Sequence, residues 1–268
     1  MASAPVRGMR DAMVAVFSGI WNWPVWATLG WNDIEQRYRR SVIGPFWIMI
    51  SLGIFISALG LVYSRLFGVA PEQYIPFLAS GFLVWNLVST LTNEGCLIFV
   101  EAEPILKQVP VPLSTFAMKT LWRNVLVLLH CLPIYLVILV AFPVEVDADT
   151  LMVLPGFFLL CVNLLWVVLA LGIICARFRD VTLIVQSALQ VLFFLTPVFW
   201  QRELLKGRAE IIVDANPLFH LIDVVRSPLL GHMPSTFSFV YVCALAVIGW
   251  AATLFLYWKS SYRIAYWV

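Results

Sequence analysis

Long apolar stretches separated by short polar segments cover most of the 268-residue chain. Six stretches have the character of membrane-crossing helices: residues 46–63, 74–92, 116–142, 151–176, 181–200 and 237–258. A helix needs about 20 mostly apolar residues to cross a hydrocarbon core about 30 Å thick, and flanking residues add length to shorter stretches. The pattern therefore predicts an all-α integral membrane protein with six transmembrane helices.

An amphipathic segment, residues 23–43, precedes the first apolar stretch. Trp23, Trp31 and Tyr38 recur at helical spacing on one face, and the opposite face carries acidic, amide and arginine side chains. A helix with a tryptophan-rich apolar face and an arginine-containing polar face is typical of the membrane interface. We therefore predict an N-terminal amphipathic interface helix. A soluble amphipathic helix followed by a buried core helix is the alternative interpretation.

Two segments between apolar stretches are too polar to span and too apolar to be free linkers. Residues 94–113 hold short apolar pieces between acidic residues and prolines, which indicates a short helix docked on the rest of the protein. Residues 201–235 are too long for a hairpin, and Asn216-Pro217 within them is a strong helix start. Short amphipathic helices between the fifth and sixth spans are typical of re-entrant or interfacial half-helices.

Polar side chains occur at helical spacing inside two of the predicted spans. Asn86 lies on one face of the second span, and Gln186, Gln190 and Phe193 share a face of the fifth. Amide groups in lipid are costly unless they meet another helix or water. Two interpretations remain for the fifth span: a hydrogen-bonded seam between helices, or a water-lined path or gate.

The distribution of basic residues predicts the orientation. Six spans leave both termini on one side, and that side would hold twelve basic residues: Arg7, Arg10, Arg37, Arg39, Arg40, Lys107, Lys119, Arg123, Arg177, Arg179, Lys259 and Arg263. The other side would hold five: Arg65, Arg202, Lys206, Arg208 and Arg226. Basic residues concentrate on the cytoplasmic side of membrane proteins, so we predict that both termini are cytoplasmic.

Catalytic and metal-binding patterns are missing from the sequence. The three histidines lie far apart, the five cysteines are scattered singly, and no H-E-x-x-H or G-x-S-x-G motif occurs. The phosphate-binding motif G-x-x-x-x-G-K-[ST] is also missing. We therefore predict no catalytic residues, no metal site and no cofactor in this chain. Hydrophobic residues make up 62% and charged residues 12%, whereas about a quarter of the residues of a soluble domain are charged. Six spans with polar inner faces, a docked helix and re-entrant helices indicate a translocation path that another protein drives.

Several motifs, in order, resemble those of ABC-type polysaccharide export permeases. DIEQRYRR at 33–40 followed by IGPFW at 43–47 resembles the entry signature of that family. ILKQVPVPL at 105–113 is similar to its stretch between spans two and three. The remaining matches are FRDV at 178–181, TPV at 196–198 and NPLFHLI at 216–222. The resemblance covers roughly residues 25–258.

The resemblance implies one permease domain over residues 1–268 that forms a homodimer. It implies two copies of a separate ABC ATP-binding subunit, which would carry the ATP and magnesium. Lipid-linked polysaccharide, such as O-antigen for lipopolysaccharide or a capsule, would cross the bacterial inner membrane between the protomers. An ABC permease for another cargo, such as teichoic acid or a drug, is the first alternative. An intramembrane lipid-modifying transferase is a further alternative, and it would need a polar cluster that the sequence does not offer.

The resemblance also assigns expected roles to individual residues. ATPase coupling is expected within 94–113, at Glu101, Glu103, Pro104, Leu106 and Lys107, where simple solvation of the carboxylates is the alternative. The pyrophosphate of the lipid carrier, or anionic headgroups generally, would meet Arg37, Arg39 and Arg40. The channel lining would include Trp47, Phe55, Asn86, Gln186, Gln190 and Phe193, with ordinary packing as the alternative for the aromatic residues. The periplasmic gate within 201–235 would include Asn216, Pro217, His220 and Arg226.

Overall fold

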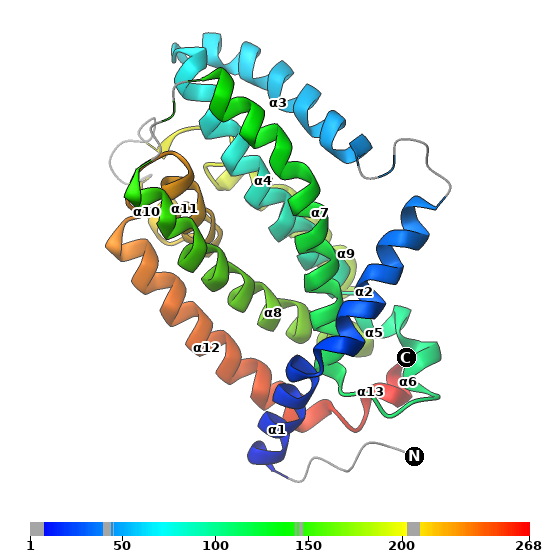
Figure 1. Cartoon of the computed structure of the whole chain (residues 1–268). Coiled ribbons are helices and arrows are strands. Elements are labelled where there is room, and N and C mark those ends of the chain that lie inside the picture. The colour runs from blue at the N-terminus through cyan, green and yellow to red at the C-terminus, as the bar shows by residue number, and fades with distance from the viewer. Residues whose placement is uncertain (1–7, 40–43, 45, 143, 145–146, 203–209) are drawn as a thin grey trace.

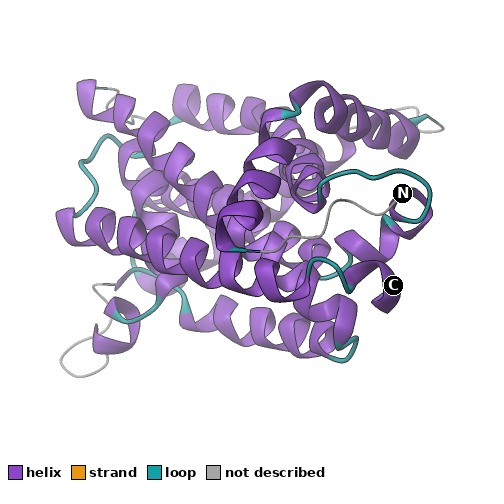
Figure 2. Cartoon of the chain, turned by 90° about the horizontal axis from the view of Figure 1, so that it is seen from below, coloured by secondary structure: helices purple, strands orange, loops and turns teal. Residues whose placement is uncertain are grey.

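The computed structural model describes residues 8–39, 44, 46–142, 144, 147–202 and 210–268. All regular secondary structure within these residues is helical, as predicted (Figures 1 and 2). Five helical segments in the described part of the chain are long and apolar enough to cross a membrane. They are α3 (Phe46–Phe67), α4 (Pro71–Gly95), α7 (Leu113–Ala141), the 3-10 turn η1 (Ala148–Met152) continued by α8 (Val153–Arg177), and α12 (Thr236–Ser260).

The predicted fifth span is shorter than the sequence pattern indicated. Helix α9 (Val181–Leu195) has 15 residues, so it is about 22 Å long at 1.5 Å per residue. It ends because Thr196, which precedes Pro197, adopts an extended conformation with φ −95° and ψ 132°. The ring of a proline disfavours helical conformation in the residue before it. The predicted end at Trp200 was therefore wrong, and membrane crossing by this segment stays a prediction.

Two helices form the N-terminal part of the described chain. Helix α1 (Met9–Trp21), which the sequence analysis did not anticipate, buries Ala12, Val16 and Gly19 and packs against α7 and α12. Helix α2 (Trp23–Tyr38) begins with a proline in its first turn and packs along α7. The predicted interface helix thus corresponds to α2, while its predicted last residues, 40–43, lie outside the described residues.

Short helices occupy the two ends of the bundle. Helices α5 (Ile98–Glu101) and α6 (Glu103–Leu106) lie at the same end as α1 and the C-terminal helix α13 (Ile264–Trp267) (Figure 1). Helices α10 (Glu210–Asp214) and α11 (Pro217–Leu229) lie at the opposite end (Figure 1). The described chain therefore begins and ends at the same end of the bundle (Figure 1).

Helix α4 forms the centre of the core. It contacts α3, α7, α8, α9 and α11, and its side chains Tyr74, Leu78 and Leu91 are fully buried. The Tyr74 hydroxyl donates a hydrogen bond to the carbonyl of Phe199, which joins α4 to the chain after α9. Helix α3, in contrast, leaves most of its apolar side chains exposed.

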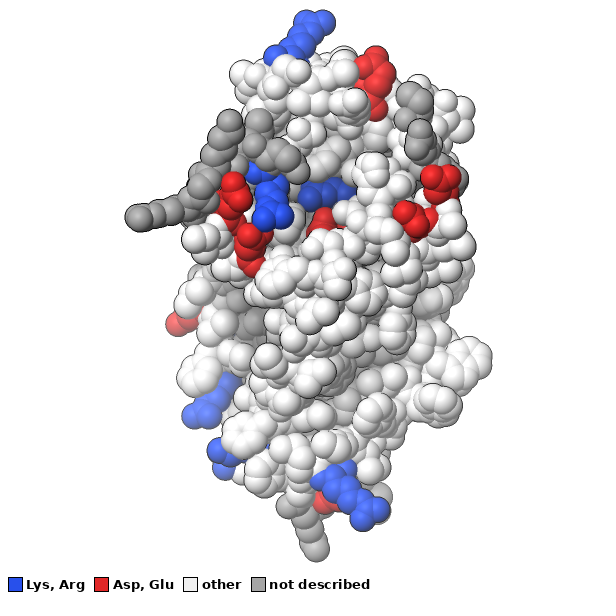
Figure 3. All heavy atoms as spheres, turned by 90° about the vertical axis from the view of Figure 1, so that its left-hand side faces the viewer, with Lys and Arg blue, Asp and Glu red and all other residues white. Residues whose placement is uncertain are grey.

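Charged side chains gather toward the two ends of the molecule. On the face of Figure 3, a broad band with almost no charged atoms separates a hollow containing charges of both signs from basic side chains at the other end. Exposed apolar side chains on α8 and α12, such as Phe158 and Val247, are typical of a surface that faces lipid. The distribution is that of a protein embedded in a membrane.

Candidate functional site

Helices α2, α4 and α7 meet at a group of ionic side chains near the α1 end, which we call the α2–α7 charge cluster. Arg123 on α7 lies at its centre, with 8% of its surface exposed. Its Nη1 donates to Asp33 Oδ2 on α2 at 2.7 Å, and its Nη2 donates to Glu94 Oε2 on α4 at 2.7 Å. Lys119 also contacts Asp33, at 2.8 Å, and Arg37 lies 3.5 Å from Glu94. One buried guanidinium therefore joins three helices.

A glycine allows α2 to approach α7 closely enough for this pairing. A Cβ atom at Gly30 would lie 3.0 Å from Trp122 Cδ1 and 3.1 Å from the carbonyl oxygen of Lys119. One turn earlier, the rings of Trp26 and Trp122 pack edge to face at a centroid distance of 5.9 Å. Aromatic and glycine contacts thus set the helix separation, and the cluster forms one turn further along α2.

The cluster lies directly before the segment predicted to contact the ATPase. Glu94 is in the last turn of α4, and α5 begins four residues later at Ile98. Ile98 and Phe99 are buried against Gly172 of α8. The chain therefore runs from α5 directly back to Glu94, whose partner Arg123 also pairs with Asp33 of α2.

The predicted coupling residues lie on two short helical turns, as a docked segment requires. Glu101 and Pro104 are exposed, Leu106 is half-buried, and Lys107 Nζ lies 2.6 Å from Glu103 Oε1. The hydrogen bond and charge of Lys107 hold the pKa of Glu103 below its ordinary value. Lys107 also donates to the backbone carbonyl of Val268 at 3.2 Å. Glu103 therefore has an ionic partner within this chain.

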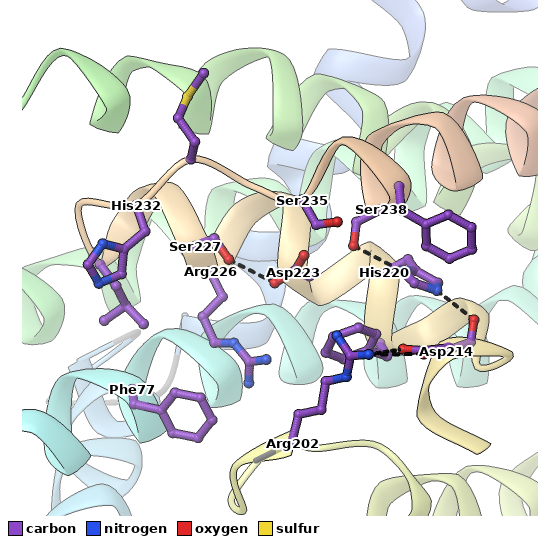
Figure 4. A pocket seen from close by; sticks show the side chains of 14 residues that line it. Phe77, Arg202, Asp214, His220, Asp223, Arg226, Ser227, His232, Ser235 and Ser238 are labelled. Carbon is purple, nitrogen blue, oxygen red and sulfur yellow. Dashed lines mark hydrogen bonds and ion pairs between the residues drawn. The ribbon is translucent and has the colours of Figure 1, made fainter. Parts of the chain in front are cut away.

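Two of the four residues predicted for the gate, His220 and Arg226, line a pocket at the opposite end, which we call the α11 pocket. Its volume is about 590 Å³, within the range of roughly 300–1,000 Å³ typical of ligand sites. It is lined by Phe77, Arg202, Asp214, Phe219, His220, Asp223, Arg226, Ser227, Leu230, His232, Met233, Ser235, Phe237 and Ser238 (Figure 4).

The start of α11 is organised by Asn216 and Pro217, as the sequence predicted. The Asn216 side-chain oxygen accepts from the Leu218 amide at 3.0 Å, and its Nδ2 donates to the Thr196 hydroxyl at 2.9 Å. Pro217 occupies the first turn, where a missing N–H group costs no intrahelical hydrogen bond. The helix start is thereby tied to the extended residue that ends α9.

Two buried side chains of α11 form the floor of the α11 pocket. His220, 1% exposed, lies 2.9 Å from both the Ser238 hydroxyl and the Asp214 carbonyl through its two ring nitrogens. Arg226 donates to the carbonyl of Pro197 at 2.6 Å and lies 4.4 Å from the ring centroid of Phe77. On the rim, Arg202 pairs with Asp214 at 2.7 Å.

The predicted channel-lining residues do not share one environment. Trp47 is exposed, as are Gln186 and Gln190 on α9, and Asn86 is half-buried. Phe55 packs edge to face on Phe82 at 5.0 Å. Phe193 contacts Phe82, Trp85, Phe194 and Phe199 at centroid distances of 5.3–5.7 Å, and so belongs to an aromatic cluster. The lining role of these residues stays a prediction.

The three arginines predicted to contact lipid headgroups do not share one environment either. Arg37 is half-exposed and pairs with Glu94, so it belongs to the charge cluster. Arg39 is exposed, and Arg40 lies outside the described residues. On α2, Trp23 and Trp31 face outward, whereas Gly30 and Ile34 are buried. The face that packs on α7 is therefore rotated from the tryptophan stripe that the sequence indicated.

Sequence reasoning missed the central members of the charge cluster and several lining residues of the α11 pocket, although it had predicted the floor residues His220 and Arg226. Glu94, Lys119 and Arg123 were given no role in a site, and Asp33 entered only as part of a family motif. A signal was present, because Lys119 and Arg123 lie inside the predicted span 116–142, where a charge requires a partner. Of the α11 pocket, the residues missed include Phe77, Arg202, Asp214 and Asp223, which lie up to about 150 residues apart in the chain.

Comparison with known proteins gives a match over most of the chain. A sequence profile of the family described as ABC-2 type transporter matches residues 24–230, from the first turn of α2 to the end of α11. Two proteins from Klebsiella pneumoniae, each described as O-antigen export system permease protein RfbA, are 21% identical to the chain over 241 residues. Each alignment covers 87% of this chain and 91% of the relative.

Proposed function

The chain belongs to the ABC-2 type transporter family, and from this premise we propose that it is the permease subunit of an ATP-driven exporter of lipid-linked polysaccharide. Members of this family are transport subunits, so the chain is a multi-pass ABC permease that works with an ATP-binding subunit. The proposed cargo is of the O-antigen type, and the proposed membrane is the bacterial inner membrane.

The length of the similarity to the O-antigen permeases carries this proposal. It extends over 241 residues, and so includes the coupling segment, the apolar helices and the α11 region together. A shared motif alone would support only a common ATPase contact, whereas similarity over the whole path supports a related cargo. The proposed ATP-binding partner would supply the nucleotide-binding motif that this sequence lacks.

The exposed faces of α3 and α9 support a homodimer with the path between the protomers. Gln186 and Gln190 lie exposed on α9, and Trp47 and Ile54 lie exposed on α3. Amide side chains are costly against lipid and favourable against water or a sugar polymer. A second protomer facing these helices would enclose a path lined by amides and aromatic rings.

The test of the function uses a host strain without this gene. Loss of long-chain polysaccharide at the cell surface, with its accumulation inside, is expected, and the wild-type gene should restore export. The tagged chain, purified in mild detergent, should carry an ATP-binding protein at equal stoichiometry. An ATP-binding partner with unchanged surface polysaccharide would contradict the proposed cargo and leave an ABC permease for another substrate.

The proposed path has a separate test. Gln190→Leu should reduce export severalfold without reducing protein in the membrane, because it removes an exposed amide from the path. Leu183→Gln adds an amide to another exposed position of α9 and serves as the matched control. Unchanged export with Gln190→Leu would contradict the lining role of α9.

A further inference from the structure

The α11 pocket is lined by two positively charged and two negatively charged side chains, which distinguishes it from an anion site. Arg202 and Arg226 line it together with Asp214 and Asp223. Three serine hydroxyls and two histidine rings add further hydrogen-bonding groups. A ligand with a single negative charge would meet repulsion from the carboxylates, whereas a ligand with both charges matches the lining.

The cationic side of the pocket suits a phosphate group. A guanidinium has five N–H donors in a planar fork that matches phosphate oxygens. Arg202 and Asp214 have 41% and 39% of their side-chain surfaces exposed, so their ion pair leaves part of the Arg202 guanidinium accessible from the cavity. Arg226 adds positive charge at the floor (Figure 4).

The anionic side of the pocket suits a primary ammonium group. Asp223 lines the cavity from α11 and accepts a hydrogen bond from Ser227 at 2.7 Å (Figure 4). A carboxylate has about four acceptor positions, so Asp223 retains the capacity to accept from a cationic donor. An ammonium carries three donors, whereas a trimethylated ammonium has none.

The position of the pocket suits a headgroup attached to apolar chains. The hollow with charges of both signs in Figure 3 lies beside the broad uncharged band of the same face. Phe237, in the first turn of α12, is 59% exposed at the pocket rim, and Val240 follows at 61% exposed one turn below. A ligand bound in the pocket could therefore continue along the exposed apolar surface of α12.

We propose that the α11 pocket binds the phosphoethanolamine headgroup of a membrane phospholipid, with the phosphate toward Arg202 and Arg226 and the ammonium toward Asp223. The acyl chains lie along α12. This inference does not depend on the polysaccharide cargo, because it requires only that the α11 end reaches the headgroup layer of a bilayer.

The experiment measures lipid binding to the purified full-length protein. Delipidated protein is titrated in native mass spectrometry with dioleoyl phosphatidylethanolamine, phosphatidylcholine and phosphatidylglycerol at equal concentrations. We expect phosphatidylethanolamine to bind severalfold more tightly than the other two. Asp223→Asn should weaken it roughly tenfold, the scale of one charge-assisted hydrogen bond, and abolish the preference over phosphatidylcholine.

A matched variant and a soluble probe separate the alternatives. Asp147→Asn removes an exposed carboxylate outside the α11 pocket and should leave binding unchanged. Equal binding of the three lipids, or equal effects of the two variants, would overturn the proposal. Soluble O-phosphoethanolamine should compete weakly, since it lacks the chains. If it binds as tightly as the lipid, or if a soluble host oligosaccharide binds in an Asp223-dependent manner instead, a membrane lipid is not the ligand.

Discussion

Two buried arginines, one near each end of the molecule, are used in different ways. Arg123 is held by carboxylates from two other helices, and these ion pairs fill the space between α2, α4 and α7. Arg226 donates to a backbone carbonyl, packs on the ring of Phe77 and borders a cavity of about 590 Å³. A charge enclosed by charged partners stabilises one arrangement of helices, while a charge beside open space is available to a ligand.

The two ends of the molecule are held together by different interactions. Movement of α2 away from α7 would separate buried opposite charges, which is costly where the dielectric constant is low. We therefore expect α2, α4 and the first half of α7 to move as one body during transport. The α11 end is held instead by the packing of buried residues such as Leu221, Ile222 and Val225 on neighbouring helices, and by hydrogen bonds such as that of Asn216 to Thr196.

The strongest test removes the centre of the α2–α7 charge cluster. Arg123→Met leaves the partly buried carboxylates of Asp33 and Glu94 without their shared partner, and should lower the free energy of unfolding by about 3–5 kcal/mol. Thermal and denaturant unfolding in detergent measure the change. Arg39→Met, at an exposed position, should change it by no more than about 0.5 kcal/mol.

A compensating variant sharpens this result. When Asp33→Asn and Glu94→Gln are combined with Arg123→Met, the partly buried carboxylates are replaced by neutral amides, so most of the lost stability should return. A triple variant as unstable as Arg123→Met would mean that helix packing, and not charge pairing, accounts for the loss.

The next largest effect concerns the approach of α2 to α7. Gly30→Val brings Cβ to about 3.0 Å from Trp122 and from a backbone carbonyl, so the helices must separate, at about 1–3 kcal/mol. Limited proteolysis should cleave after α2 more rapidly, because the charge cluster loosens. Gly8→Val meets no atom within 4 Å and is the matched control. Equal proteolysis of the two variants would contradict the close contact.

At the α11 end a smaller loss is expected from the helix start. Asn216→Ala removes the cap of α11 and the hydrogen bond to Thr196, and should cost about 1 kcal/mol of unfolding free energy. Asn32→Ala, at an exposed position within α2, should cost less. Hydrogen exchange would localise the change to α11, and a change spread over the bundle would argue against local capping.

The smallest effect is expected at the coupling segment. The pKa of Glu103 is lowered by Lys107, so the pair stabilises the folded state at neutral pH, and this contribution disappears as pH falls through the lowered pKa. Glu103→Gln should therefore leave unfolding at neutral pH almost unchanged, since the pair is exposed. At acid pH the free energy of unfolding of the wild-type protein should decrease slightly as Glu103 is protonated. This decrease should be missing in Glu103→Gln and present in Glu101→Gln. An equal decrease of the unfolding free energy at acid pH in both variants would contradict the pairing of Glu103 with Lys107.

The sequence alone predicted most helices and their approximate ends. Apolar runs and proline or asparagine starts are local signals, and they correspond to α3, α4, α7, α8, α11 and α12. The end of a helix was predicted wrongly where an apolar run and a proline indicated different ends. At Thr196-Pro197 the apolar run continues while the backbone turns, and the proline determined the end of α9.

The sites could be predicted only in part, because their members are distant in the chain. Asn216 and Pro217 were recognised from their own dipeptide. Arg123 contacts a residue 90 positions earlier and another 29 positions earlier, and nothing in the local sequence specifies those partners.

The sequence by itself determined that this chain folds into apolar helices, since burial of nonpolar surface in lipid or protein follows from each segment alone. It also determined where charges concentrate along the chain. The tertiary structure decided which charges neutralise one another and which remain beside a cavity. Electrostatic pairing depends on distances of about 3 Å between atoms from separate helices, and those distances exist only after the helices have packed.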